Sequence, residues 1–178
     1  MHWARKAMSI ETAKLVSKLP CEAMDAMEIS GVYWSGMQRW KSFESLHYPE
    51  FDICADCKLY EAYDIIFAEQ VFEHLPFPNR AARNVRQLLR PAGYFLLTVP
   101  FLIRIHKFPL DCTRWTPEGL KFFLMESGFE ASRIQTYSWG NRECVISNFD
   151  KWTKFNRNIH SLENDLAFPV VVWGLAQK

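Results

Sequence analysis

Apolar residues recur along the chain with two different periods, which predict helices alternating with strands. Residues 10–19 carry apolar side chains at helical spacing, with Ser9 as a possible N-cap and Pro20 ending the run. A second helical pattern covers residues 79–90, with Asn79 as a possible N-cap. A third follows Thr116-Pro117, a cap with proline at the first helical position. The pattern therefore predicts three helices spread along the chain.

Short apolar runs between these helices predict strands. The segment Tyr63–Ala68 is typical of a strand that is buried on both faces of a parallel sheet. The alternation predicts an α/β fold: one doubly wound, Rossmann-like, mostly parallel sheet with helices on both faces, in a single domain spanning residues 1–178. No structure is predicted for residues 141–168. The predicted strands are residues 23–30, 43–46, 51–54, 63–68, 94–99, 134–139 and 170–175.

Composition narrows the classes of partner. The formal net charge is +1, so no strong field attracts nucleic acid or an anionic membrane. No signal peptide and no membrane-spanning run is apparent, and we expect a soluble, cytoplasmic protein. Cys54 and Cys57 form a C-x-x-C pair without a second ligand pair, so no metal site is expected.

Ligands of such sheets bind beyond the carboxyl ends of the strands, so the residues that follow each strand are the candidates for a site. The strand ending at Ala68 leads into Glu69-Gln70-Val71-Phe72-Glu73-His74-Leu75-Pro76, then a helix, then Leu89-Arg90-Pro91-Ala92-Gly93 and another apolar strand. This order resembles the class I S-adenosylmethionine-dependent methyltransferases of the small-molecule type, over residues 51–129. A second block, from Ile105-His106 through Asp111 and Arg114-Trp115 to Phe129, resembles the segment after strand five in one branch of that family.

The first cofactor motif departs from the family pattern. There an acidic residue is followed by Gly-x-Gly-x-Gly, in which the glycines let the backbone approach the cofactor. Here Glu28 occupies the acidic place, and Ser30, Val32 and Trp34 occupy the glycine places. No G-x-G-x-x-G motif of a nicotinamide enzyme is present either.

The resemblance implies S-adenosylmethionine as cofactor and a set of residues that contact it. Glu28, with Ser30 and Gly31, would hold the amino-acid part. Glu44 would accept from the ribose hydroxyls, with His47 and Glu50 as alternatives. Asp56 would accept from the adenine amino group, with Asp52 as the rival, although either aspartate also fits a turn that satisfies local backbone. Glu69, Gln70 and Val71 would pack on the cofactor.

The residues after strand five would serve the methyl acceptor. His106 is the candidate general base because its ordinary pKa lies near the working pH. Asp111 would orient it or bind substrate; alternatively, Asp111 and Arg114 form a structural salt bridge. His74, Arg114 and Trp115 are candidate substrate contacts, although a histidine such as His74 also serves to hold a turn together.

Four aromatic residues admit two interpretations. They either shelter the sulfonium through cation–π contact or belong to the core. They are Tyr33, Trp34, Trp40 and Trp115.

These observations predict methyl transfer to an oxygen or nitrogen of a small-molecule or sugar acceptor. Two other classes stay open. One is a catalytically inactive relative that binds a partner or glycan. The other is a nucleic-acid or protein methyltransferase that uses the basic residues between Arg80 and Arg90. We expect no nucleic-acid or membrane partner, and the sequence leaves the oligomeric state open.

Overall fold

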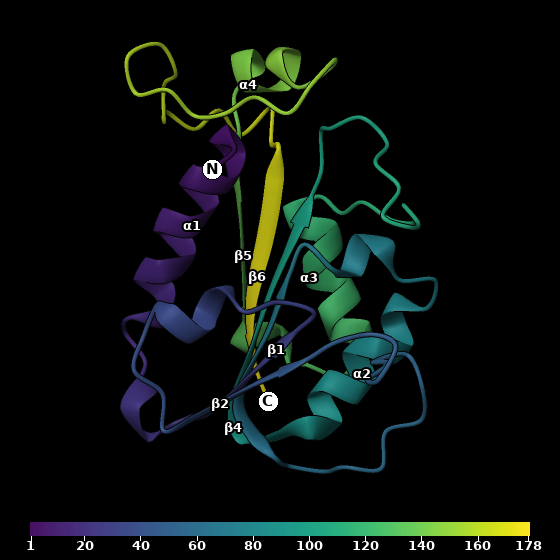
Figure 1. Cartoon of the computed structure of the whole chain (residues 1–178). Coiled ribbons are helices and arrows are strands. Elements are labelled where there is room, and N and C mark those ends of the chain that lie inside the picture. The colour runs from purple at the N-terminus through teal and green to yellow at the C-terminus, as the bar shows by residue number, and fades with distance from the viewer.

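A six-stranded sheet forms the centre of the structure, a computed structural model that describes all 178 residues (Figure 1). The strands lie in the order β2-β1-β3-β4-β6-β5. Their bounds are β1 Asp25–Ile29, β2 Ser42–Leu46, β3 Tyr63–Glu69, β4 Leu89–Pro100, β5 Ile134–Trp139 and β6 Val171–Gln177. The helices are α1 Trp3–Val16, α2 Pro78–Leu88, α3 Pro117–Glu126 and α4 Arg142–Ser147.

The sheet is mostly parallel, as predicted. β1 pairs in parallel with β2 and β3, and β3 pairs in parallel with β4. β6 runs antiparallel between β4 and β5. Since parallel neighbours need crossovers, the first four strands end at one common edge of the sheet.

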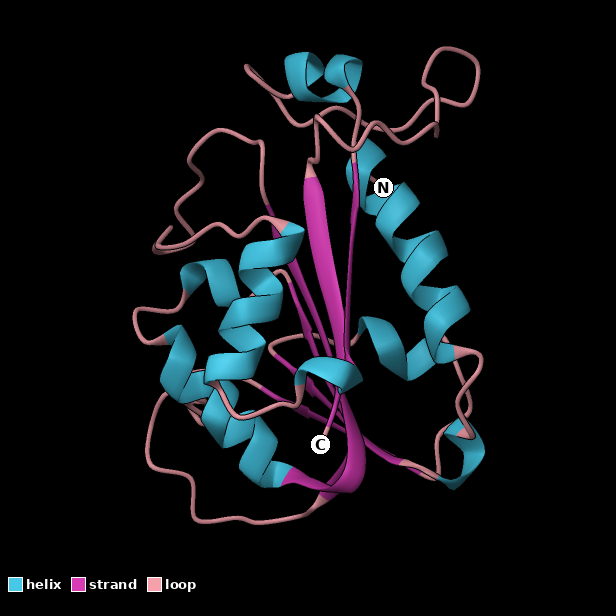
Figure 2. Ribbon diagram, turned by 180° about the vertical axis from the view of Figure 1, so that it is seen from behind, coloured by secondary structure: helices cyan, strands magenta, loops and turns pink.

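Helices cover both faces of the sheet (Figure 2), which confirms the predicted fold class. In β3, Ile66 and Ala68 face the apolar cluster built with α2 and α3. The intervening Ile65 and Phe67 face a second cluster, built with α1. The continuous apolar run of β3 is therefore explained by burial on both sides.

The helix boundaries depart from prediction where tertiary packing overrides local signals. Ser9 is no N-cap: α1 begins six residues earlier, at Trp3, and Ser9 is buried inside it. Likewise Asn79 does not cap α2, and its side-chain amide donates instead to Glu126. Thr116 does cap α3, because its Oγ1 accepts from Gly119 N at 3.0 Å.

The strand predicted at residues 51–54 is wrong. This segment forms a turn in which Asp52 Oδ1 accepts from Cys54 N at 2.8 Å. Ile53 and Cys54 are buried under α2, so their apolar character reflects packing rather than strand pairing. β2 is consequently the outermost strand on this side of the sheet.

The segment between β5 and β6 covers the ligand-binding edge (Figure 1). It contains α4 and lies beside the start of α1, where Trp3 Nε1 donates to Ser161 O at 2.8 Å. Because β6 is antiparallel, its first residue pairs with Pro100 at the end of β4. The inserted segment thus lies at the carboxyl edge of the parallel strands. No helix has both the length and the apolar character needed to cross a membrane.

Candidate functional site

Two buried carboxylates lie at the ends of the neighbouring strands β1 and β3. Glu28 is 1% exposed and accepts from Trp34 N at 2.8 Å, which caps the short turn after β1. Glu69 is the last residue of β3 and is also buried. Burial raises the pKa of each carboxyl group, and the neighbouring Glu69 raises the pKa of Glu28 further.

Gly31 permits the close approach of Glu28 to the turn. A Cβ at this position would lie 2.2 Å from Glu28 Oε1. The preceding Ser30 has φ +56°, a left-handed conformation that is uncommon outside glycine. Glu28, Ser30 and Gly31 are therefore brought together at the end of β1. The chain then forms one 3₁₀ turn, Tyr33–Gly36, in place of a longer crossover helix.

Arg5 of α1 supplies the only ion-pair partner of Glu69. Its Nη2 lies 2.5 Å from Glu69 Oε1, while Glu69 Oε2 is buried without a hydrogen-bond partner. Sequence reasoning missed Arg5, because a lone arginine on an N-terminal helix gives no local sign that it reaches a strand end.

Gln70 and Val71 follow β3 but face different surroundings. Gln70 has φ +58°, and its side-chain amide donates to Thr98 Oγ1 at 3.2 Å. It lines a cavity of about 210 Å³ at this edge. Val71 packs instead against the core cluster beneath α2 and α3. Of the two, only Gln70 lines the cavity.

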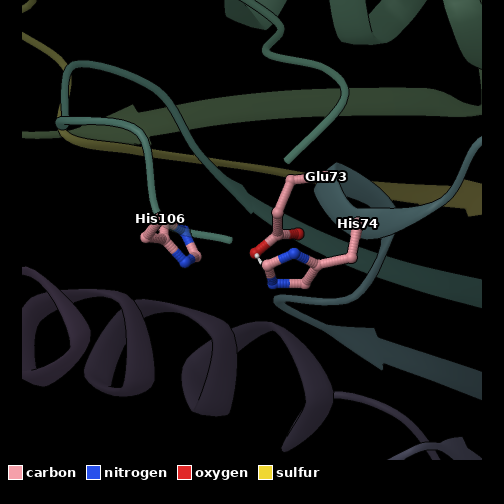
Figure 3. Close-up of side chains that lie close together, drawn as sticks. All are labelled: Glu73, His74 and His106. Carbon is pink, nitrogen blue, oxygen red and sulfur yellow. Dashed lines mark ion pairs between the residues drawn. The ribbon is translucent and has the colours of Figure 1, made fainter. Parts of the chain in front are cut away.

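Glu73, His74 and His106 lie close together beyond β3 and β4 (Figure 3). The Glu73 carboxylate is fully buried, and neither oxygen has a hydrogen-bond partner. Burial raises its pKa to about 8. His74 Nε2 lies 3.6 Å from Glu73 Oε1, and the rings of His74 and His106 are 5.1 Å apart and perpendicular.

His74 also holds two loops together. Its Nδ1 makes a 2.5 Å hydrogen bond to Leu110 O. Since a carbonyl only accepts, Nδ1 carries the proton, so in the neutral ring the lone pair is on Nε2, which faces Glu73. The turn-holding role that the sequence left open is thus observed.

Asp111 forms the structural salt bridge rather than an ion pair with the His106 ring. Its carboxylate binds the Arg114 guanidinium through both oxygens, one of them 2.6 Å from Nη2. It contacts His106 only through the backbone, accepting from the amide N at 2.7 Å. Although burial acts to raise it, these bonds hold the pKa of Asp111 below its usual value. Asp111 therefore shapes the loop that presents His106.

Neither Arg114 nor Trp115 lines the cavity. The ring of Trp115 packs on Phe123 of α3, with centroids 4.9 Å apart. Arg114 thus forms a salt bridge and Trp115 packs against the core, and the predicted substrate contacts of both stay predictions.

The cavity of about 210 Å³ draws its walls from both ends of the chain. His106 and Gln70 supply polar atoms, and burial together with the neighbouring His74 lowers the pKa of His106. The lining residues are His2, Ala4, Arg5, Met8, Gln70, Pro100, Ile103, His106, Asn148, Trp152, Val170 and Val171.

Two predicted cofactor contacts lie away from this edge. Glu44 is in the middle of β2, two residues before its end, and its carboxylate accepts from the Tyr63 hydroxyl. Asp56 is exposed in the loop where no strand forms, so the reason for assigning it to adenine is removed. The residue that follows β2 is His47, whose ring lies 2.8 Å from Ser45 Oγ.

The aromatic residues after β1 belong to the core. Trp34 is fully buried and stacks on Phe67 with centroids 4.5 Å apart. The indole of Trp40 donates to Trp34 O at 2.8 Å. Of the two interpretations of the aromatic set, packing is the one that Trp34 and Trp40 follow.

A family model described as a methyltransferase domain matches residues 12–153, most of the chain. The chain belongs to this methyltransferase family. No curated protein matches it.

Solved methyltransferases share the fold of this one at low sequence identity. An S-adenosylmethionine-dependent methyltransferase from Thermotoga maritima, described as a possible histamine N-methyltransferase, superimposes with a TM-score of 0.63 at 14% identity, over 97% of this chain and 89% of that one. One from Mesorhizobium loti gives 0.62 at 14% identity, over 94% and 97%. One from Archaeoglobus fulgidus gives 0.62 at 13% identity, over 96% and 94%.

This chain is therefore an S-adenosylmethionine-dependent methyltransferase, and its buried charges fit that cofactor. Two buried carboxylates, Glu28 and Glu69, are matched by one cation, Arg5, and Glu69 Oε2 lacks a partner. S-adenosylmethionine carries a cationic ammonium and a cationic sulfonium. Its ammonium group would compensate the second buried carboxylate, so Glu28 and Glu69 are the residues that would hold that ammonium group.

Sequence reasoning missed most of the cavity. Met8 comes from α1, and Trp152 comes from the segment for which no structure was predicted. Gln70 and His106 were chosen as candidates because they follow predicted strands. Neither Met8 nor Trp152 follows one. A cavity built from distant segments gives no short motif.

Proposed function

We propose that this methyltransferase transfers the methyl group of S-adenosylmethionine to an oxygen or nitrogen of a small-molecule or sugar acceptor that binds in the cavity of about 210 Å³. The observation that carries the proposal is the position of His106. It lines the cavity on the loop that follows β4, beside Gln70 at the end of β3.

The cavity suits a small acceptor. Its volume is below the roughly 300–1,000 Å³ that is typical of pockets for drug-sized ligands. Trp152 and the apolar side chains of Met8 and Ile103 provide flat and aliphatic walls, and Gln70 and His106 provide hydrogen-bonding groups. Such a mixture suits the apolar face and the hydroxyl groups of a sugar ring or a similar molecule.

The cofactor supplies a methyl group on a good leaving group, so the protein's task is mainly positioning. Glu28 and Glu69 would orient the cofactor's amino-acid part, while the cavity walls align the acceptor and exclude water. When the nucleophile is a hydroxyl, the neutral imidazole of His106 accepts its proton. Loss of such a base typically lowers kcat by about 10²–10⁴-fold.

The basic residues on and after α2 give limited support to a nucleic-acid acceptor. Arg90 is engaged by Asp25 and Asp64 at 2.9 and 2.7 Å. Arg80 lies over the Phe77 ring, 5.0 Å from its centroid. Arg83 is also exposed, but it does not form a continuous basic stripe with these residues.

The test is formation of S-adenosylhomocysteine with a panel of sugars, small alcohols and amines. Trp152→Ala should raise the KM for the acceptor without changing cofactor affinity. Phe149→Ala is the matched control, since this exposed side chain is in the same segment but outside the cavity. Turnover only with RNA, DNA or protein, or equal behaviour of the two variants, would contradict the proposal.

A further inference from the structure

The Glu73 carboxylate is the least satisfied polar group of the fold. Its side chain is fully buried, and both oxygens lack hydrogen-bond partners. A buried carboxylate without a partner is unfavourable by several kcal/mol, so such a group is usually paired or bound to a metal. Figure 3 shows it directed toward the rings of His74 and His106.

We propose that Glu73, His74 and His106 bind one divalent transition-metal ion. Each offers one ligand atom, and the three atoms lie within 4.8 Å of one another. One carboxylate and two imidazoles form a ligand set typical of zinc, iron(II), cobalt(II) and manganese(II). This inference goes beyond the methyl transfer proposed above and does not depend on the identity of the acceptor, but in the metal-bound protein it replaces the role of His106 as free base.

The hydrogen bond of His74 prepares it as a ligand. Nδ1 is bonded to Leu110 O at 2.5 Å, so in the neutral ring Nε2, 3.6 Å from Glu73 Oε1, is the nitrogen free to bind a metal. Histidines that bind metals usually donate the other ring N–H to a carbonyl or carboxylate in this way. The backbone therefore fixes both the tautomer and the orientation of His74.

The distances suit an ion between the groups. Two ligands bound at about 2.1 Å with a tetrahedral angle lie about 3.4 Å apart. The separation of His74 Nε2 and Glu73 Oε1 is 3.6 Å. His106 is on a partly exposed loop and its ligand atom lies within 4.8 Å of the other two, so a small movement of this loop would bring it to the same spacing.

The open positions of the ion would face the cavity, because His106 lines it. Three protein ligands with a free position are typical of catalytic rather than structural zinc sites. A metal-bound His106 no longer acts as the free base. The ion instead polarises an acceptor hydroxyl that binds at its open position, which favours loss of the hydroxyl proton.

The experiment uses the whole chain, freed of metal by a chelator and titrated with Co²⁺ and Zn²⁺ in the absence of cofactor and acceptor. We expect one equivalent of Co²⁺ to bind with a visible d–d spectrum, and Zn²⁺ to displace it. Glu73→Gln and His106→Gln should each lower affinity beyond the roughly 10–100-fold cost of changing an outer-shell partner. Glu73→Gln keeps nearly the same side-chain volume but cannot ionise, and its thermal unfolding curve is compared with that of the unmodified protein, so that lost binding is distinguished from unfolding.

Two controls separate this site from adventitious binding. His47→Gln removes an exposed histidine outside the cluster and should bind Co²⁺ as the unmodified protein does. Cys112→Ser removes the exposed thiol nearest to His74, and should also retain binding. A thiolate–cobalt charge-transfer band, or unchanged affinity in both Glu73→Gln and His106→Gln, would overturn the proposal. Because no cofactor is present, failure here would leave the methyl-transfer proposal standing.

Discussion

Arg5 and Glu69, 64 residues apart in the sequence, form an ion pair of 2.5 Å that joins α1 to the end of β3. The Glu69 side chain is 2% exposed, so this contact brings the N-terminal helix to the cofactor edge of the sheet.

Arg5→Gln should destabilise the fold. It removes the partner of Glu69 Oε1 and leaves both buried carboxylate oxygens unpaired, at a cost of about 1–3 kcal/mol. The free energy of unfolding in urea measures this. Lys6→Gln, a neighbouring position on α1 without an ion-pair partner, is the control. Equal stability of the two variants would show that the pair contributes nothing.

Gly31→Ala should disturb both stability and cofactor binding. The added Cβ would lie 2.2 Å from Glu28 Oε1 and would push the carboxylate away from Trp34 N. Overpacking of this kind costs about 1–3 kcal/mol. Thermal unfolding and calorimetric titration with S-adenosylmethionine check the two effects. Gly36→Ala, in the same turn with nothing within 4 Å of the added atom, should leave both unchanged.

Stability and cofactor affinity should respond to pH in opposite directions. Burial raises the pKa of Glu28 and Glu69, so the stability they contribute to the free protein is fully present below the ordinary glutamate pKa and is lost as pH rises through the raised values. The same rise ionises both groups and strengthens their attraction for a cationic cofactor.

Unfolding and titration curves between about pH 4 and 8 test this, with the difference between the unmodified protein and Glu28→Gln isolating one group. Glu28→Gln should flatten both dependences. For each quantity, the contribution of Glu28 is the difference between the unmodified protein and Glu28→Gln. If the contributions to stability and to cofactor affinity changed with pH in the same direction, the role assigned to Glu28 would be refuted.

The cysteines should differ sharply in reactivity. Burial raises the pKa of the Cys144 thiol to about 12, so it stays protonated near neutral pH, whereas Cys112 is exposed. Alkylation followed by mass spectrometry should modify Cys112 first and Cys144 only in denaturant. Early labelling of Cys144 would mean that α4 opens readily in the native state.

The sequence predicted elements whose signals are local or repeated. The strand β3 was predicted from its continuous apolar run, and the start of α3 was predicted from the capping hydrogen bond that Thr116 can accept. Both predictions are confirmed. The Ser9 cap and the strand at residues 51–54 failed because packing decided those segments. Serine is a common cap residue but also occurs inside helices, as Ser9 does here. An apolar residue such as Ile53 is equally suited to a strand and to burial under a helix, which is where it lies.

The site was predictable only where it follows a strand end. The sequence predicted that Glu28 and Glu69 lie at this edge, because the carboxyl edge of a parallel sheet is a general ligand site, and both lie at the ends of their strands. Arg5 and Trp152 come from segments that meet this edge only in the folded chain. The residues of the proposed metal site were not recognised as ligands: His74 and His106 were assigned other roles and Glu73 none, because Glu73-His74 and His106 are 32 residues apart and match no ligand spacing.

The interior position of β6 sets the order in which the molecule is completed. Residues 171–177 lie between β4 and β5, so a nascent chain that has emerged only as far as β5 has no strand to join β5 to the rest of the sheet. Val171 at the start of β6 also closes one wall of the cavity. During synthesis, at roughly 5–20 residues per second, the earlier strands therefore emerge and collapse first. The binding cavity forms only after this last strand has left the ribosome.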